Sequence, residues 1–178
     1  MTRLVAALLG AALLFAPAAR ADAAQEEEAE KFLGKKAPAF AFPLDGFRMV
    51  SLRRMLVSKK PIVLSFFAWH CKPCEKGLPM LVKTVGKFGR KNVEVLLVHV
   101  GEDKDGEMNK LLERTGAGKL PLVVDSNRAQ AGKFGADKTI PRTVVIDTAG
   151  VVRAFFLEEG ENFESELETK LKEASSES

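Results

Sequence analysis

The feature that most constrains the fold is an apolar strand pattern that leads directly into a helical pattern. Residues 61–69, PIVLSFFAW, form a bounded apolar run that is long enough for a buried strand. Apolar residues then recur at helical spacing, and Pro79 lies inside that pattern, where we expect it to kink the helix. The residues of the helical pattern are Leu78, Leu81, Val82, Val85 and Phe88.

Strand and helix patterns continue to alternate along the rest of the chain. They first predict a strand at 93–100, a helix at 107–114, a strand at 120–125 and a helix at 128–134. Two strands then follow at 142–147 and 151–157 around a turn at 148–150, and a last helix is capped by Asn162. This order predicts an α/β sandwich in which a central mixed β-sheet carries helices on both faces.

Length and composition are those of one soluble domain. The chain has 178 residues, of which 46% are hydrophobic and 29% charged, which is ordinary for a globular protein with a sizeable core. The net charge is +3, but without Arg3 and Arg20 in the first 20 residues the chain has 25 basic against 24 acidic residues. Charge therefore gives no reason to expect nucleic acid or an anionic membrane as a partner, and we expect a monomer.

The first residues have the pattern of an export signal. Arg3 precedes a continuous apolar run from Leu4 to Phe15, and Ala19-Arg20-Ala21 supplies an A-x-A cleavage site. We expect a signal peptide at 1–21, with cleavage after residue 21 or 23, and a mature chain in the periplasm, where disulfide chemistry is available. The alternative is a retained inner-membrane anchor, for which the apolar run is shorter than the ~20 residues that span a bilayer.

Beyond the signal, the chain divides into three segments. Residues 22–33 are small and acidic, and this composition predicts a flexible leader. Residues 34–173 carry all the strand and helix patterns and form the folded domain. Residues 174–178, ASSES, are expected to be a disordered tail. The sequence contains no internal repeat and no second composition regime, so one domain is predicted.

The chain contains two cysteines, Cys71 and Cys74, and several interpretations of the pair are open. A structural disulfide would close a four-residue loop and contribute about 2 kcal/mol, against about 3 kcal/mol for a 15-residue loop, so it would be a weak staple. Structural zinc lacks ligands, because only His70 and His99 accompany the cysteines and no zinc-finger spacing is present. A copper-handling chaperone stays open, because Cu(I) accepts two thiolates.

A redox-active dithiol explains where the pair lies. Cys71 opens the predicted helix, where unpaired backbone N–H groups and the helix dipole favour a thiolate. Lys72 and Lys76 add positive charge nearby, and Pro73 stiffens the first turn without removing a helical hydrogen bond. Cys74 lies one turn further on, more buried and placed to attack a mixed disulfide at Cys71. We therefore expect Cys71 to be the nucleophile and Cys74 the resolving thiol. No metal and no cofactor is needed.

From about residue 34 to 171 the sequence resembles the exported TlpA/ResA-like branch of the thioredoxin-fold thiol-disulfide oxidoreductases. The matching stretches, in the family's order, are GKKAPAFAFPLDG, VSL, IVLSFFA, C-K-P-C followed by Pro79, VEVLLVHVGED, LPLVVD, TIPRTVVID and TAGVVRAF. A lone C-x-x-C is a moderate signal, whereas this series of contexts is a strong one.

The resemblance implies a thioredoxin-like fold and a protein-disulfide reductase that works through a mixed disulfide at Cys71. It implies a cis peptide at Ile140–Pro141, which would lie beside the cysteines and bind the substrate's extended chain. It also implies protein disulfides as substrates, apocytochrome c of cytochrome c biogenesis among them, and an upstream membrane thiol donor. A redox-inert thioredoxin-fold binding module is the further alternative.

The sequence departs from the family at four positions. His70 stands where tryptophan is common before the first cysteine, and Arg142 follows Pro141 where a small hydroxyl residue is frequent. Ser65 and Gly77 stand where relatives carry an acid that accepts the proton of the second cysteine. Glu75, water or His70 could take that role. His70 either tunes the Cys71 thiolate or fills the place of the tryptophan.

Overall fold

The structure is a computed structural model that describes residues 27–45, 48–157 and 160–176. The expected signal peptide at 1–21, its cleavage sites and the alternative membrane anchor lie outside these residues. Within the described part of the chain, no helix combines the length and the apolar character needed to cross a bilayer.

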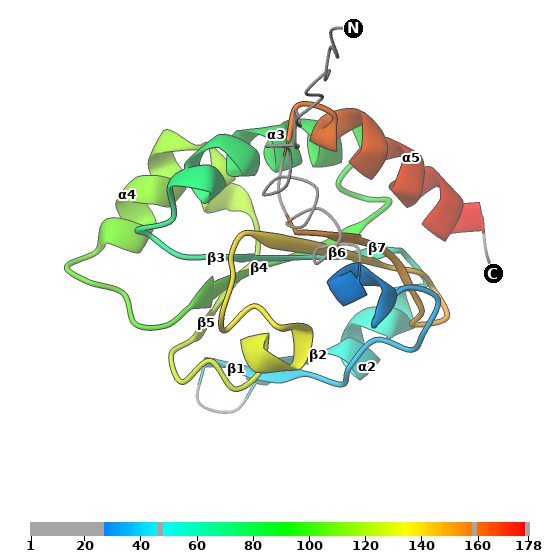
Figure 1. Cartoon of the computed structure of the whole chain (residues 1–178), viewed down its shortest axis with the longest axis horizontal. Coiled ribbons are helices and arrows are strands. Elements are labelled where there is room, and N and C mark those ends of the chain that lie inside the picture. The colour runs from blue at the N-terminus through cyan, green and yellow to red at the C-terminus, as the bar shows by residue number, and fades with distance from the viewer. Residues whose placement is uncertain (1–26, 46–47, 158–159, 177–178) are drawn as a thin grey trace, which may run out of the picture.

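A five-stranded mixed sheet forms the centre of the molecule (Figure 1), with strand order β5-β4-β3-β6-β7. Strands β3 (Ile62–Phe67), β4 (Glu94–Val100) and β5 (Leu122–Asp125) are parallel. Strands β6 (Arg142–Ile146) and β7 (Val152–Phe156) form the expected hairpin, and β6 pairs antiparallel with β3. Every residue of β3 is buried, because strands flank it on both edges and apolar layers cover both its faces.

The three long helices cover one face of this sheet (Figure 1). They are α3 (Lys72–Phe88), α4 (Glu107–Arg114) and α5 (Phe163–Ser176). The other face carries the β1 (Ala41–Asp45) and β2 (Arg48–Ser51) hairpin, the short helix α2 (Leu52–Met55), and the 3-10 segment Ala131–Phe134. Two more 3-10 segments are Leu56–Ser58 and Ala117–Lys119. The predicted layered α/β, thioredoxin-like architecture is confirmed.

Two elements differ from their predictions. The helix expected at 128–134 is only the 3-10 segment Ala131–Phe134, which ends at Gly135 with a φ of 66°. Its start is held by the Asp125 carboxylate, which accepts the backbone N–H groups of Gln130 and Ala131. The disordered tail predicted at 174–178 is wrong for its first three residues, because α5 continues to Ser176 and buries Ala174 against the core.

The flexible leader predicted at 22–33 is wrong for residues 27–33, which the structure describes as packed. Residues 27–30 form a helical turn, and the Phe32 ring stacks on Phe155 at a centroid distance of 4.6 Å. The backbone then follows the edge of β7, because Gly34 donates to the Val152 carbonyl. The composition of the segment concealed this, because one phenylalanine supplies most of its apolar contact.

A partly buried ion pair ties the same segment to the start of β6. The guanidinium of Arg142 is 1% exposed and donates to Glu28 Oε1 at 2.9 Å. It also donates to the carbonyls of Thr139 and Phe134. A Cβ atom at Gly135 would lie 2.7 Å from Glu28 Oε1, so any side chain there would displace the pair.

We expect Glu28→Gln to lower the free energy of unfolding by about 1–2 kcal/mol, because the buried guanidinium keeps a hydrogen-bond acceptor but loses its counter-charge. Urea denaturation of the oxidised protein measures this. The matched control is Glu27→Gln, whose Lys31 partner is exposed, and we expect a change within about 0.5 kcal/mol. Equal effects of the two substitutions would contradict a structural role for the Glu28–Arg142 pair.

Candidate functional site

The two cysteines lie at the start of helix α3, directly after the buried strand β3. Cys71 is the N-cap of α3, and its backbone N–H closes a turn onto the Ala68 carbonyl. Cys74 lies in the first helical turn, and a disulfide joins the two residues with a Cα–Cα distance of 5.3 Å. Pro73 lies in the first turn of α3, where its missing N–H group removes no helical hydrogen bond.

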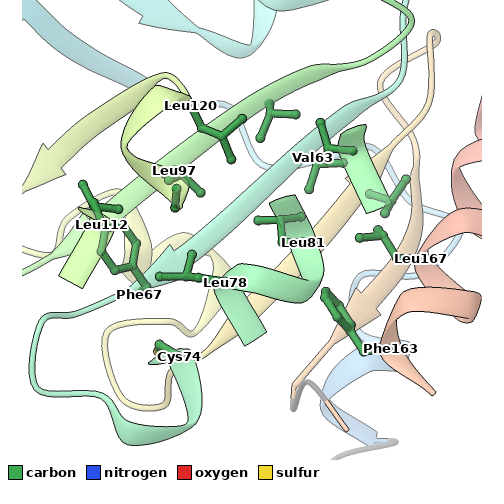
Figure 2. Close-up of a cluster of buried hydrophobic side chains, with 14 of the residues drawn as sticks. Val63, Phe67, Cys74, Leu78, Leu81, Leu97, Leu112, Leu120, Phe163 and Leu167 are labelled. Atoms are coloured by element: carbon green, nitrogen blue, oxygen red, sulfur yellow. The ribbon is translucent and has the colours of Figure 1, made fainter. Parts of the chain in front are cut away.

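The two sulfur atoms occupy different environments. Cys74 is fully buried and points into the core on the same side of α3 as Leu78 and Leu81 (Figure 2), whereas Cys71 keeps 7% of its surface exposed. The Cys74 backbone N–H donates to Cys71 Sγ at 3.2 Å. A donor aimed at this sulfur from a helix N-terminus stabilises a Cys71 thiolate in the reduced protein.

The charged neighbours of the cysteines pair with one another. Lys72 is almost fully exposed, and its ammonium lies 3.6 Å from the Glu75 carboxylate. Arg114 of α4 donates to the same carboxylate at 2.9 Å. The Arg114 hydrogen bond, followed by the charge of Lys72, lowers the pKa of Glu75 below its ordinary value. Glu75 is therefore a weak base, which argues against it as the acceptor of the Cys74 proton.

His70 points away from the core. The residue is exposed, and its ring meets the half-buried ring of Trp69 edge-on at a centroid distance of 5.0 Å. Its contact is thus with its neighbour in sequence, not with an apolar pocket. Both interpretations of His70, as a residue that tunes the Cys71 thiolate and as a side chain that stands in the place of the tryptophan, stay predictions.

Ser65, one of the two positions where the resemblance implied an acid, makes a hydrogen bond between uncharged side chains. Ser65 lies on β3, buried, on the same face as Val63 and Phe67, which is the face that α3 covers. The Thr143 hydroxyl donates to the Ser65 hydroxyl at 3.3 Å across the β3–β6 pair. Gly77, the other expected acid position, is buried inside α3. Of the two positions where the family resemblance implied an acid, one therefore carries a hydroxyl group and the other has no side chain.

The peptide between Ile140 and Pro141 is cis, as the family resemblance implied. Pro141 is buried and Ile140 half-buried at the start of β6. Both line a groove of about 350 Å³ whose other residues are Lys72, Pro73, Lys76, Thr139, Leu157 and Gly160. The structure thus brings the first turn of α3 and the proline loop together around one cavity, although they are far apart in the sequence.

His99 belongs to the same end of the sheet and was not predicted to take part. It is fully buried in β4, its ring meets Phe67 edge-on, and its Nε2 atom lies 3.3 Å from the Trp69 backbone nitrogen. Burial lowers the pKa of His99 below its ordinary 6.5. The folded protein therefore favours a neutral ring, and this contribution to stability is lost as the pH falls from about 6.5 toward the lowered value.

Among the described residues, no group of three or more His, Cys, Asp and Glu side chains has the arrangement of a metal site. Cys71 and Cys74 are both used by the disulfide, and a disulfide offers no thiolate to a metal. The chemistry that this site offers in the form described here is thiol-disulfide exchange.

Comparison with known proteins agrees with this chemistry. Residues 33–155, more than half of the chain, match the AhpC/TSA family. The chain belongs to the AhpC/TSA family. It is 29% identical over 141 residues to the thiol-disulfide oxidoreductase ResA of Bacillus thuringiensis (strain Al Hakam), and the aligned residues make up 79% of this chain and 77% of the relative. It is also 29% identical over 122 residues to the methylamine utilization protein MauD of Methylorubrum extorquens, covering 68% and 56% of the two chains.

Solved structures show the same likeness. A crystal structure from Chlorobium tepidum, assigned as thiol:disulfide interchange protein DsbE, has a TM-score of 0.67 and 25% identity and covers 81% of this chain and 98% of that one. A solution structure from Bacteroides thetaiotaomicron, at 22% identity and a TM-score of 0.69, covers 82% and 91% and shows the shared fold. This AhpC/TSA family member is a thiol-disulfide oxidoreductase of the ResA and DsbE type, with a cysteine pair at disulfide distance.

Sequence reasoning missed two residues at this end of the sheet. In the sequence, Arg142 stands out only as a departure from the family, and His99 only as one of two histidines, which are too few for a zinc site. A charged or ionisable side chain inside an otherwise apolar strand is the signal that could have found both, because a buried polar group needs a partner.

In the reduced protein, we expect the Cys74→Ser variant to react with iodoacetamide at least about tenfold faster than the Cys71→Ser variant near neutral pH. The reason is that Cys71 is 7% exposed and its Sγ atom has the Cys74 N–H donor, whereas Cys74 is fully buried. Alkylation rates measured by mass spectrometry test this. Both variants unfolded in urea should react alike, and equal rates in the folded state would contradict the assignment of Cys71 as nucleophile.

Proposed function

We propose that this protein is an exported protein-disulfide reductase that works through the C-K-P-C dithiol. The observation that carries the proposal is the unequal burial of the two cysteines at the start of α3, where Cys71 is 7% exposed and Cys74 is fully buried, with the Ile140–Pro141 loop across a groove from Pro73. A reachable thiolate attacks a foreign disulfide, and a buried thiol next to it resolves the product. A disulfide that served only stability would not need this asymmetry.

The reaction consists of two exchanges. In the first, the Cys71 thiolate attacks one sulfur of a substrate disulfide, so that a Cys71–substrate disulfide forms and the other substrate sulfur leaves as a thiolate and takes a proton. In the second, Cys74 gives up its proton and attacks Cys71 Sγ, which releases the second substrate thiol. The substrate gains two electrons and two protons, and the protein ends with the Cys71–Cys74 disulfide. An upstream dithiol donor at the membrane then reduces this disulfide.

The groove between α3 and the proline loop is the proposed site for the substrate's backbone. It lies between Pro73 on one side and Ile140 and Pro141 on the other, so an extended chain in it would lie against the first turn of α3, which Cys71 caps. The loop residues 139–141 that precede β6 are held by the hydrogen bond from the Arg142 guanidinium to the Thr139 carbonyl. The loop is therefore supported independently of a bound substrate.

The direction of exchange, the compartment and the substrates rest on the sequence and on the relatives. The apolar N-terminal run with its A-x-A site supports export to the periplasm. The likeness to ResA supports action on protein disulfides, and we propose apocytochrome c as one substrate. Such a reductase needs a steady supply of electrons, which explains the proposed membrane donor.

We expect Cys74→Ser, expressed in the native compartment, to accumulate mixed disulfides on Cys71, because the second exchange is blocked. Non-reducing electrophoresis followed by mass spectrometry identifies the trapped proteins. The matched control is Cys71→Ser, which keeps the buried thiol and should trap about tenfold less. If the Cys74→Ser variant traps no protein, the exchange mechanism is wrong.

We also expect the periplasmic fraction to contain a chain that begins at Asp22 or Ala24, with most of its cysteine pair reduced. The physical reason is that a reductase must be held in the dithiol form by its donor, whereas an oxidase must be held as the disulfide. Rapid acid trapping followed by alkylation and intact-mass measurement reads both properties at once. A mainly oxidised pair in the wild-type cell would reverse the proposed direction, and an uncut chain would favour the membrane anchor.

A further inference from the structure

His99 is a buried ionisable residue that takes no part in the two exchange steps of the proposed mechanism. It lies at the end of β4 opposite Phe67 of β3, on the sheet face that carries α3 and both cysteines. Its Nδ1 atom lies 3.2 Å from the Gly101 carbonyl oxygen, and its Nε2 atom accepts the Trp69 backbone N–H at 3.3 Å. Both ring nitrogen atoms therefore have a backbone partner.

These two partners fix the proton on the ring. A backbone N–H can only donate, so Nε2 must be the acceptor for Trp69, and a carbonyl can only accept, so Nδ1 must carry the hydrogen toward Gly101. Only this neutral tautomer satisfies both contacts. A second proton on Nε2 would point at the Trp69 N–H and remove its acceptor.

The Trp69 amide is part of the turn that presents Cys71. The turn starts at the Ala68 carbonyl, which accepts the Cys71 N–H at 3.1 Å, and Trp69 is its second residue. Cys71 in turn caps α3 and receives the Cys74 N–H. The His99 ring, 30 residues away in sequence, is thus joined by one hydrogen bond to the turn that ends in the proposed nucleophile.

The charges around His99 come from several elements. Burial lowers its pKa most, the charge of His70 lowers it further, and the Gly101 carbonyl and Asp103 raise it. The Arg128 guanidinium lies beside Gly101, and the Asp125 carboxylate at the end of β5 is held by two backbone N–H groups. On the α3 side, Glu75 is paired with Lys72 and Arg114. The neutral ring is therefore the state that this environment favours near neutral pH.

We propose that His99 is a positioning residue for Cys71: its neutral ring holds the Trp69 amide and thereby the turn at 68–71, and protonation in acid releases that turn. The effect is a pH-dependent loss of exchange rate that is separate from the titration of the thiol. This inference rests on the proposed function, in which Cys71 is the attacking thiol. His99 then positions the turn at 68–71 in addition to filling space in the core.

Two substitutions separate positioning from packing, both made in a Cys74→Ser background in which Cys71 is the single thiol. His99→Gln places a neutral acceptor near the former Nε2 atom, whereas His99→Phe fills the same apolar space without an acceptor. The measurement is the Cys71 alkylation rate per thiolate, with the thiolate fraction followed by ultraviolet absorbance, between about pH 4.5 and pH 8. Amide hydrogen exchange at Trp69 is measured alongside.

With His99 present, we expect the rate per thiolate to fall about five- to tenfold in acid, because a buried N–H that loses its acceptor is costly. At neutral pH, the rate per thiolate of His99→Gln should lie within about twofold of the rate of the Cys74→Ser protein that keeps His99, and it should not fall in acid. His99→Phe should be about five- to tenfold slower throughout and should exchange the Trp69 amide faster. His70→Ala is the control for the exposed histidine and should keep the fall in acid.

A core-filling role predicts the opposite order, with Phe tolerated and Gln damaging. The proposal is overturned if His99→Phe reacts as fast as His99→Gln, or if the fall in acid persists in His99→Gln or vanishes in His70→Ala. If His99→Phe does not fold, the comparison of His99→Gln with the unsubstituted residue decides alone. A small alkylating reagent needs no substrate protein, so failure here is distinct from failure of the Cys74→Ser variant to trap substrates.

Discussion

The complete burial of strand β3 is the constraint on which the rest of the molecule depends. Its two edges pair with β4 and β6, and apolar clusters from two separate layers close over its two faces. A strand enclosed in this way cannot shift without breaking every neighbouring contact. Because β3 ends four residues before Cys71, its rigidity fixes the place where α3 begins and where the first sulfur is presented.

The site at the end of that strand is assembled almost entirely from backbone groups. The Cys74 N–H faces Cys71 Sγ, the Ala68 carbonyl closes the turn, and the Trp69 N–H is held by His99. The charged side chains nearby, Lys72 and Glu75, neutralise each other at the surface. The environment of Cys71, the proposed nucleophile, is thus set by fixed dipoles, which salt screens far less than surface charges.

How much of this could be predicted from the sequence depended on how local each interaction is. The β3 and α4 patterns repeat within a few residues and predicted both elements correctly, and C-K-P-C after a buried strand indicated the candidate site. The cis peptide came from the family resemblance, since the dipeptide alone does not specify it. The contacts of Glu28 with Arg142 and of His99 with Trp69 join residues 114 and 30 positions apart, and neither leaves a periodic trace. The short 3-10 segment after β5 likewise depends on the Asp125 carboxylate, not on helical spacing.

The Glu28–Arg142 pair also has a practical meaning for anyone who handles the protein. Arg142 follows Pro141 directly and supports the Thr139 carbonyl, so one side chain links Glu28, near the start of the described chain, to a residue that lines the groove. A fluorescent protein or affinity tag attached just ahead of Glu27 would be joined one residue from the carboxylate that pairs with Arg142, so any pull on this segment would act on the support of the Thr139 carbonyl. A fusion beyond α5 leaves this contact intact and is the sounder choice for labelling.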